Sequence, residues 1–434
     1  MTIDLLLRSA REVAHRGLDT VVVWLEVEVF DPLHRRFPGA DWKFVAIFAA
    51  LLFPFFEPVG LRYIVSPVIG KVYLGLQFAA VVVIALLYIF RTPKDCFSMI
   101  AIAIVALMFV STAINEGNGR AWIYTQCFCD WTPLAVAVLL VAYARTNHMT
   151  ELLWSIMIVT GVLSICNTIS VLVWPHGIVT GGREPANFFG HKNASIDLIL
   201  SSVGCSLLLD ASQRKLFSAR STVFLVMGFV QCTVSYSATS LVALIVLLVL
   251  FIVVQFRQAR SFVNGLSCLA AYLLSTVLLL GVKVQELFAP LIVGALGKSI
   301  TFTGRTFVWD GILSIMDAAH LFVGYGASLR FGLVFNDYLY NNAHNFALHV
   351  FVSGGLLGVT LYGGLLMLAA RSLYRRRRER SAAVLTVVLA CFLVIGLMES
   401  LITIAWPLFV ALAYYCASPE DERNSSGTSS VVRP

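Results

Sequence analysis

The sequence predicts an all-α integral membrane protein with about 12 transmembrane helices and one long periplasmic loop that carries short helices. Three observations support this fold class. Of the 434 residues, 59% are hydrophobic and only 13% are charged, whereas a soluble domain carries roughly a quarter of charged residues. Apolar stretches repeatedly reach the ~20 residues that a helix needs to cross a bilayer. The alternating pattern of a membrane barrel does not occur, so helices must satisfy the backbone hydrogen bonds in lipid.

Twelve apolar spans follow one another, nine within 44–282 and three within 343–417. They lie at 44–57, 70–90, 97–114, 132–144, 152–174, 194–210, 221–237, 239–256, 262–282, 343–370, 382–398 and 401–417. The charged segment 1–43 lacks the apolar core of a signal peptide and is predicted to be cytoplasmic or interfacial. Residues 283–342 form the long periplasmic loop. The polar tail 418–434 is predicted to be disordered in the cytoplasm.

Lysine and arginine residues predict the orientation. One set of internal loops holds 14 of them, and the opposite set holds nine, of which four lie in the long loop. The N-terminal segment adds six more to the first set. Cytoplasmic loops carry an excess of Lys and Arg, so both termini are predicted to be cytoplasmic. The run RRRRER at 375–380 is interpreted as an orientation signal without a chemical role.

Three polar segments then fall on the periplasmic side. They are GGREPANFFGHKN at 181–193, TFTGRTFVWDG at 301–311 and the asparagine–histidine cluster LYNNAHNF at 339–346. A plain helix end needs one capping residue, but the cluster offers three asparagines and a histidine. Because each segment interrupts an otherwise apolar sequence, their location on one face predicts a functional site there.

Arg305, in TGRTFVW, lies at a predicted loop-to-helix junction. A guanidinium binds phosphate oxygens as a bidentate fork and stays charged at physiological pH. The alternative is an interfacial arginine that extends to lipid headgroups beside Trp309.

A second polar group consists of Arg183 and the FFGHKN residues His191, Lys192 and Asn193, and it carries the two cations Arg183 and Lys192. Clustered cations flanked by glycines suit an anionic ligand such as a phosphate. The alternative is a solvated turn in which Asn193 caps the next helix.

His344 can act as a neutral base near pH 7, and neighbouring cations would help to keep it neutral. The alternative is a hydrogen-bonded interfacial histidine. Glu399, at the outer turn before the last span, is a further candidate because acids in such positions are often functional. A polar turn would also explain Glu399.

Several motifs do not occur in the sequence. There is no Asp-x-Asp, no GxxxxGK[ST] and no HExxH, which disfavours a metal-dependent enzyme that uses nucleotide sugars. The nine cysteines show no metal-ligand spacing. The net charge of +7 comes from cations between apolar spans, so it does not indicate a nucleic-acid partner. Neither a metal nor a cofactor is predicted.

Taken together, TGRTFVWDG, GYGA at 324–327, NNAHNF and SGGLLG resemble the family of O-antigen ligases and polysaccharide-repeat polymerases. FFGHKN is most similar to the exopolysaccharide-polymerase branch, and the resemblance covers roughly 150–400. It implies a multi-span glycosyltransferase on the outer face of the inner membrane. The implied donor is an oligosaccharide on a polyprenyl pyrophosphate, with no metal or nucleotide. Arg305 and His344 match the family's functional arginine and histidine.

One element departs from the family pattern. Many ligases carry a further arginine in a Ser-Arg element, but SYSATS at 235–240 contains none. Lys192 or Arg183 would then supply the second positive charge.

The sequence therefore predicts a polymerase of exopolysaccharide repeat units, with a ligase and a transporter of lipid-linked sugars as alternatives. Arg305 would hold the pyrophosphate, and His344 would accept the proton of the attacking sugar hydroxyl. Asn342 and Asn345 would fix the acceptor or the histidine. The remaining substrate-binding candidates are Arg183, His191, Lys192, Asn193 and Glu399. The predicted partners are the lipid-linked oligosaccharide, a saccharide acceptor and membrane lipid, and the setting allows contacts with other polysaccharide export proteins.

Overall fold

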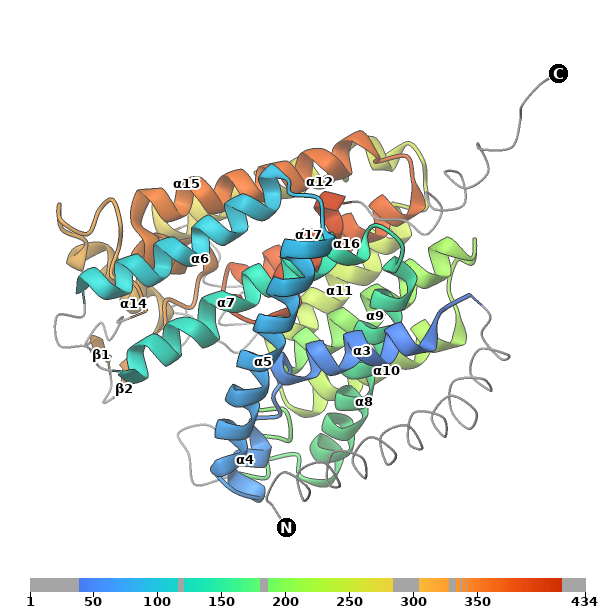
Figure 1. Cartoon of the computed structure of the whole chain (residues 1–434), viewed down its shortest axis with the longest axis horizontal. Coiled ribbons are helices and arrows are strands. Elements are labelled where there is room, and N and C mark those ends of the chain that lie inside the picture. The colour runs from blue at the N-terminus through green and yellow to red at the C-terminus, as the bar shows by residue number, and fades with distance from the viewer. Residues whose placement is uncertain are drawn as a thin grey trace, which may run out of the picture.

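The computed structural model describes residues 39–115, 121–179, 186–283, 304–327, 333–335, 338–340 and 342–415. Within these ranges it has 14 α-helices, two short 3-10 helices and one two-stranded hairpin. The helices form a bundle (Figure 1). The prediction of an all-α membrane protein is confirmed, with the small hairpin as an addition that the sequence pattern did not indicate.

Six helices are long and apolar enough to cross a membrane. They are α5 (Val68–Arg91), α6 (Cys96–Asn115), α7 (Ala121–Ala144), α8 (Met149–Val173), α9 (Ser195–Ser212) and α15 (Phe346–Arg375). Shorter apolar helices overlap the other predicted spans. They are α3 (Trp42–Leu52) with η2 (Phe53–Phe55), α10 (Ala219–Val234), α11 (Ala238–Val253), α12 (Gly265–Leu280), α16 (Arg380–Gly396) and α17 (Ala405–Tyr415).

Helix α7 begins at Ala121, well before the span predicted at 132–144. Its first half contains Gln126 and Asp130, which lower the hydropathy of this stretch. Gln126 Nε2 donates to the Asp130 carboxylate one turn further on, at 2.8 Å, so the two polar side chains support the helix. Cys127 and Cys129, which fall between the predicted spans 97–114 and 132–144, are on this helix.

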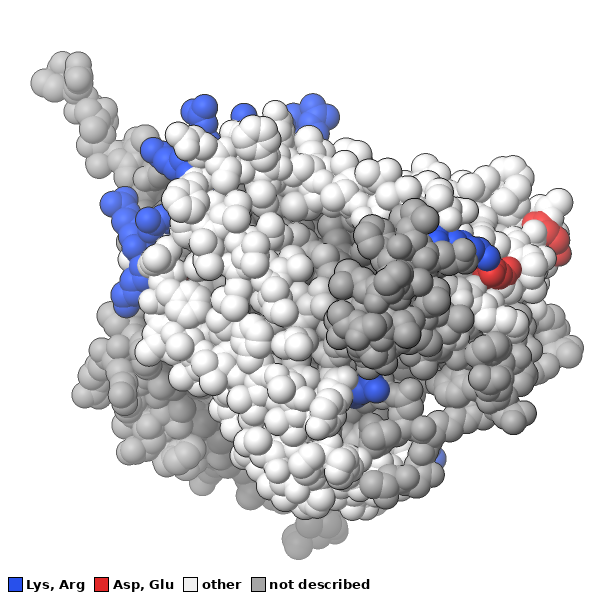
Figure 2. Space-filling model, turned by 180° about the vertical axis from the view of Figure 1, so that it is seen from behind, with Lys and Arg blue, Asp and Glu red and all other residues white. Residues whose placement is uncertain are grey.

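The turns between helices gather at two ends of the bundle. At one end, Asp95 accepts a hydrogen bond from Tyr415 and pairs with Arg145 at 3.0 Å. At the other end, which we name the site end, the turns before α9, α15 and α17 meet. Figure 2 shows one face of the molecule, on which Lys and Arg gather mainly along one edge and most of the surface is uncharged. Such a face suits contact with lipid.

The predicted loop 283–342 contains regular structure. Helix α14 (Arg305–Ile315) lies within this loop. Strands β1 (Leu333–Phe335) and β2 (Tyr338–Tyr340) form an antiparallel hairpin with Leu333 opposite Tyr340. Of the remaining short elements, α4 (Gly60–Ile64) precedes α5 and η3 (Ala259–Ser261) precedes α12.

Helix α15 is interrupted at Gly355, where φ is +60° and ψ is −158°. Residues 321–326 run against this break. Four backbone hydrogen bonds of 2.8–3.1 Å join them to the helix, from Tyr325 to Val352, from Gly326 to Ser353, from Leu356 to Leu321 and from Leu357 to Phe322. The break lies nine residues into the helix, roughly 14 Å at 1.5 Å per residue. Part of the predicted loop therefore folds back along α15 instead of staying at the N-terminus of this helix.

Helix α6 holds this returning segment from its other side. In Figure 1, α6 runs beside α15. The Ser111 hydroxyl and the Asn115 amide both donate to the carbonyl of Gly324, at 3.1 and 2.9 Å. The GYGA motif is thus clamped between two helices. Gly354 contributes close packing, since a Cβ there would meet the Met108 side chain of α6 at 2.7 Å.

Replacement of Gly355 by alanine is expected to destabilise the protein by ~2 kcal/mol or more. A Cβ at this position would lie 2.3 Å from the backbone of Phe322, and its φ and ψ are essentially restricted to glycine. Gly364→Ala is the matched control, because nothing lies within 4 Å of its Cβ position and alanine favours a helix interior by about 1 kcal/mol. Thermal unfolding of both variants in detergent tests this. Equal stability of the two variants would contradict the account of the break.

Candidate active site

Glu399 joins the polar segments at the site end. It lies in the turn between α16 and α17. Its Oε1 accepts hydrogen bonds from Arg305 Nη2 at 2.7 Å and from Asn193 Nδ2 at 2.8 Å. Its Oε2 lies 3.5 Å from His344 Nδ1. One residue from each of the three polar segments therefore meets a single carboxylate.

Arg305 is placed by the start of α14. Gly304, with φ of +88°, is the N-cap, and Arg305 is the first helical residue, as the predicted junction requires. Trp309, one turn later, is only 2% exposed and its indole Nε1 donates to the carbonyl of Ala343 at 3.0 Å. This indole therefore anchors α14 to the turn that carries His344.

His344 occupies a strained turn. Its φ is +46°, which is uncommon for a residue other than glycine. Asn342 holds the turn, since its Oδ1 accepts hydrogen bonds from the His344 backbone N at 2.7 Å and from the Ser400 hydroxyl. Asn342 thereby ties the histidine turn to the turn that carries Glu399.

Asn345 supports the same turn from inside. It is fully buried and caps α15, with its Oδ1 accepting from Leu348 N at 3.0 Å. Its Nδ2 donates to the carbonyl of Leu397 at 3.1 Å. Both contacts fix the start of α15 against the end of α16.

The FFGHKN turn presents Asn193 to the cluster. Asn193 Oδ1 accepts a hydrogen bond from the Ser237 hydroxyl at 2.7 Å, in addition to the contact with Glu399. The N-cap of α9 is Ala194, so the alternative in which Asn193 caps that helix is wrong. His191 and Lys192 are half-buried in the same turn. Arg183 lies outside the described residues.

A buried amide pair, which sequence reasoning missed, supports this turn. Asn167 Oδ1 accepts from the Phe189 backbone N at 2.9 Å, and its Nδ2 donates to Gln231 Oε1 at 2.7 Å. Gln231 is fully buried and also donates to the Ser164 hydroxyl. Both amides interrupt apolar spans, and polar residues in such positions mark functional sites. That signal was available in the sequence.

The carboxyl of Glu399 remains ionised at neutral pH. Burial alone would raise its pKa, but the hydrogen bond from His344 and the charge of Arg305 outweigh burial and lower the pKa. The side chains of Arg305, Glu399 and His344 are 18%, 21% and 24% exposed. The cluster is thus sheltered yet reachable, and it combines an arginine and a histidine beside one carboxylate.

Stability near neutral pH is expected to depend on Glu399. Because its folded pKa is lowered, the carboxylate stabilises the fold above its ordinary pKa of 4.5, and this contribution is lost as the pH falls through the lower folded value. The melting temperature of Glu399→Gln should therefore lie below that of the native protein at neutral pH, and the gap should close below about pH 4.5. A difference in melting temperature that widens on acidification would contradict this direction of the pH dependence.

Comparison with known families gives one match. Residues 223–363 match the family model described as O-antigen ligase. The matched range, about a third of the chain, contains Arg305, the clamped GYGA segment, His344 and the break in α15. No curated protein matches the chain. The motifs quoted from the sequence fall largely inside the matched range. The predicted resemblance to O-antigen ligases is therefore confirmed over residues 223–363, whereas the match does not distinguish the polymerase branch.

Proposed function

We propose that this protein is a glycosyltransferase that joins exopolysaccharide repeat units carried on a polyprenyl pyrophosphate. The observation that supports this function is the meeting of Arg305, Asn193 and His344 at Glu399. A donor on a lipid pyrophosphate needs its leaving group stabilised, and the acceptor hydroxyl needs a base. The cluster offers one residue for each task.

Arg305 would bind the pyrophosphate. Among the described residues only its Nη2 is bonded, to Glu399, so Nη1 and Nε can donate to two phosphate oxygens. As the bond between the anomeric carbon and the pyrophosphate oxygen breaks, the charge that develops on the leaving group is stabilised by the guanidinium. Lys192, in the neighbouring turn, would add a second charge. Because the donor is already activated, this chemistry requires neither a metal nor a nucleotide.

His344 would accept the proton of the acceptor hydroxyl. Its Nδ1 faces Glu399, so Nε2 would receive the proton while the hydroxyl oxygen bonds to the anomeric carbon. The carboxylate orients the ring and stabilises the imidazolium that forms. Asn342 and Asn345 keep this turn in place.

The proposed setting is the periplasmic face of the bacterial inner membrane. The loops at the site end hold nine Lys and Arg residues, four of them in the long loop, whereas the internal loops at the opposite end hold 14, and cytoplasmic loops favour such cations. The lipid-linked donor would then reach the cluster from the outer leaflet, and the glycan would grow where export proteins can receive it.

A ligase is the second candidate, and the description of the matched family supports it. The segment SYSATS favours the polymerase, because it lacks the further arginine and instead supplies Ser237 to Asn193. A transporter would place polar sites near the bilayer midplane between broken helices. Helix α15 is broken, but residues 321–326 bond to the backbone groups released at its break. Residues 321–326 therefore occupy the break, and the break does not support a transporter.

Purified protein in lipid, supplied with a polyprenyl-pyrophosphate repeat unit alone, tests the proposal. A ladder of longer glycans would establish a polymerase. Transfer only after addition of a lipid A core or another acceptor would establish a ligase. Bound donor without covalent turnover in either reaction would contradict both and favour transport.

A further inference from the structure

A shallow hollow opens at the end of the bundle opposite to Glu399. It lies between α9, α11 and α16. Most of its lining residues are apolar, among them Leu207, Phe251, Val254 and Val384, and Gln255 adds a polar side chain. Three cationic side chains also line it, those of Lys215, Arg260 and Arg380. The hollow therefore combines an apolar interior with a positively charged rim.

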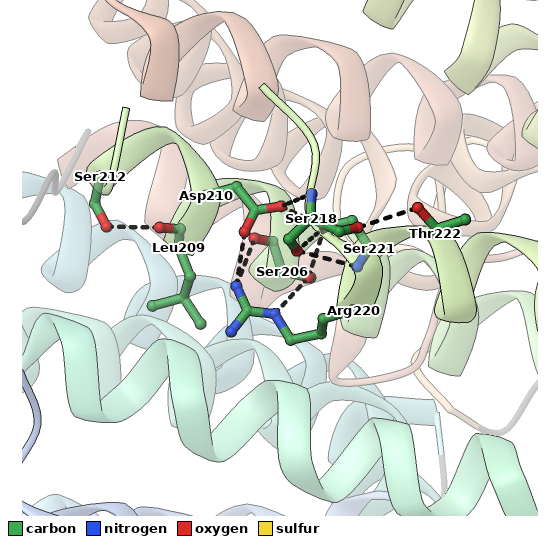
Figure 3. Close-up of polar contacts among 8 residues, drawn as sticks. All are labelled: Ser206, Leu209, Asp210, Ser212, Ser218, Arg220, Ser221 and Thr222. Carbon is green, nitrogen blue, oxygen red and sulfur yellow. Dashed lines mark hydrogen bonds and ion pairs between the residues drawn. The ribbon is translucent and has the colours of Figure 1, made fainter. Parts of the chain in front are cut away.

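Acidic side chains near these cations have other partners. Asp210 binds Arg220 Nη2 at 2.9 Å and accepts from Ser221, as Figure 3 shows. Glu379 pairs with Arg376 at 2.8 Å. Within the described part of the chain, Lys215, Arg260 and Arg380 form no ion pair, and Arg380 donates only to the backbone carbonyl of Arg214. The positive charge of the rim is not neutralised by these residues.

Arg260 is the cation that needs explanation. It is only 6% exposed, and its guanidinium donates to the carbonyls of Val254 and Arg378. Burial, and then the charges of Arg380 and Arg257, lower its pKa. The orientation of the protein in the membrane accounts for exposed cations at a helix end. It does not account for Arg260, because a buried guanidinium without a carboxylate partner is unfavourable. An anion bound at the rim would remove this penalty.

We propose that the hollow binds an anionic phospholipid of the surrounding membrane. The headgroup phosphate would lie on Lys215, Arg260 and Arg380, and the start of an acyl chain would lie between α9, α11 and α16. A free phosphate would leave the apolar walls unused, whereas a lipid matches both parts of the hollow. Because the end of α9, the end of α11 and the start of α16 form the hollow, its ligand would sit at headgroup depth. The site is separate from the cluster around Glu399, and it does not depend on the proposed reaction.

Thermal unfolding of the purified full chain in neutral detergent tests the proposal. Phosphatidylglycerol should raise the melting temperature. Phosphatidylethanolamine, inorganic phosphate and glycerol phosphate should raise it much less. The double variant Lys215→Gln/Arg380→Gln should bind phosphatidylglycerol roughly 25-fold more weakly, since each cation near a lipid headgroup contributes about fivefold. The control Arg371→Gln removes an exposed cation that does not line the hollow, and it should retain native affinity.

The unfolding temperature without lipid gives an independent readout. Removal of Arg380 relieves repulsion around Arg260, so the lipid-free double variant should be at least as stable as the native protein. Equal stabilisation by phosphatidylglycerol and phosphatidylethanolamine would overturn the proposal. So would full stabilisation by phosphate alone, which would indicate an anion site without a lipid, or an unchanged response of the double variant.

Discussion

Arg305→Lys is expected to lower glycan transfer as severely as Arg305→Ala, by roughly 10²–10³-fold. In the structure Nη2 of Arg305 is committed to Glu399 at 2.7 Å, and the other guanidinium nitrogens remain for the pyrophosphate. A lysine has one ammonium group, which would pair with Glu399 and leave no directed donor for the phosphate oxygens. Transfer from a lipid-linked repeat unit, followed as glycan length, measures the effect.

The control for Arg305 lies on the same segment. Lys283 forms an exposed ion pair with Asp310 of α14 at 2.9 Å, and exposed pairs contribute little. Lys283→Gln should therefore transfer glycan at the native rate. A fully active Arg305→Lys protein would show that a single charge suffices, and it would rule out bidentate recognition.

His344→Ala is expected to lower the rate of the transfer step by roughly 10²–10⁴-fold without weakening donor binding. The acceptor hydroxyl would lose its base, whereas Arg305 and Asn193 would keep their contacts with Glu399. Single-turnover reactions at saturating donor separate the two steps. Thermal unfolding of the variant checks that α15 still begins correctly, because Asn345 and not His344 caps it.

His176 is a suitable control histidine. It lies exposed in the turn after α8, on the same end of the bundle, and His176→Ala should be as active as the native protein. If His344→Ala kept native turnover, His344 would not be the base. Loss of donor affinity with an unchanged transfer step would instead assign it to binding.

Hydropathy predicted an apolar, helical membrane protein, and six of the described helices are long and apolar enough to cross a membrane, because burial in lipid demands apolar side chains over a helical length. It failed where polar residues pair within a helix, as Gln126 and Asp130 do in α7. Hydropathy also failed to predict the segment 321–326, which forms backbone hydrogen bonds with α15. Such a contact depends on the glycine backbone at Gly355, and no periodicity of side chains encodes it.

The chemistry of the site was readable from residue types, but its assembly was not. Arg305, His344 and Asn193 were chosen because cations, bases and amides interrupt apolar sequence. Glu399 is a candidate from the sequence too, but nothing in the sequence predicts its contact with Asn193, 206 positions away. The supporting residues Ser237 and Ser400 carry no chemical signature, so only their places in three dimensions reveal their contacts.

The interrupted helix α15 also constrains how the protein is made. Its backbone groups around Gly355 bond to residues 321–326, which leave the ribosome before α15 does. The broken form of α15 therefore leaves no unpaired amides and carbonyls in the bilayer only when that earlier segment lies against it. The Ser111 and Asn115 side chains of α6, synthesised earlier still, bond to the same segment. The shape of this helix thus depends on chain that precedes it in synthesis.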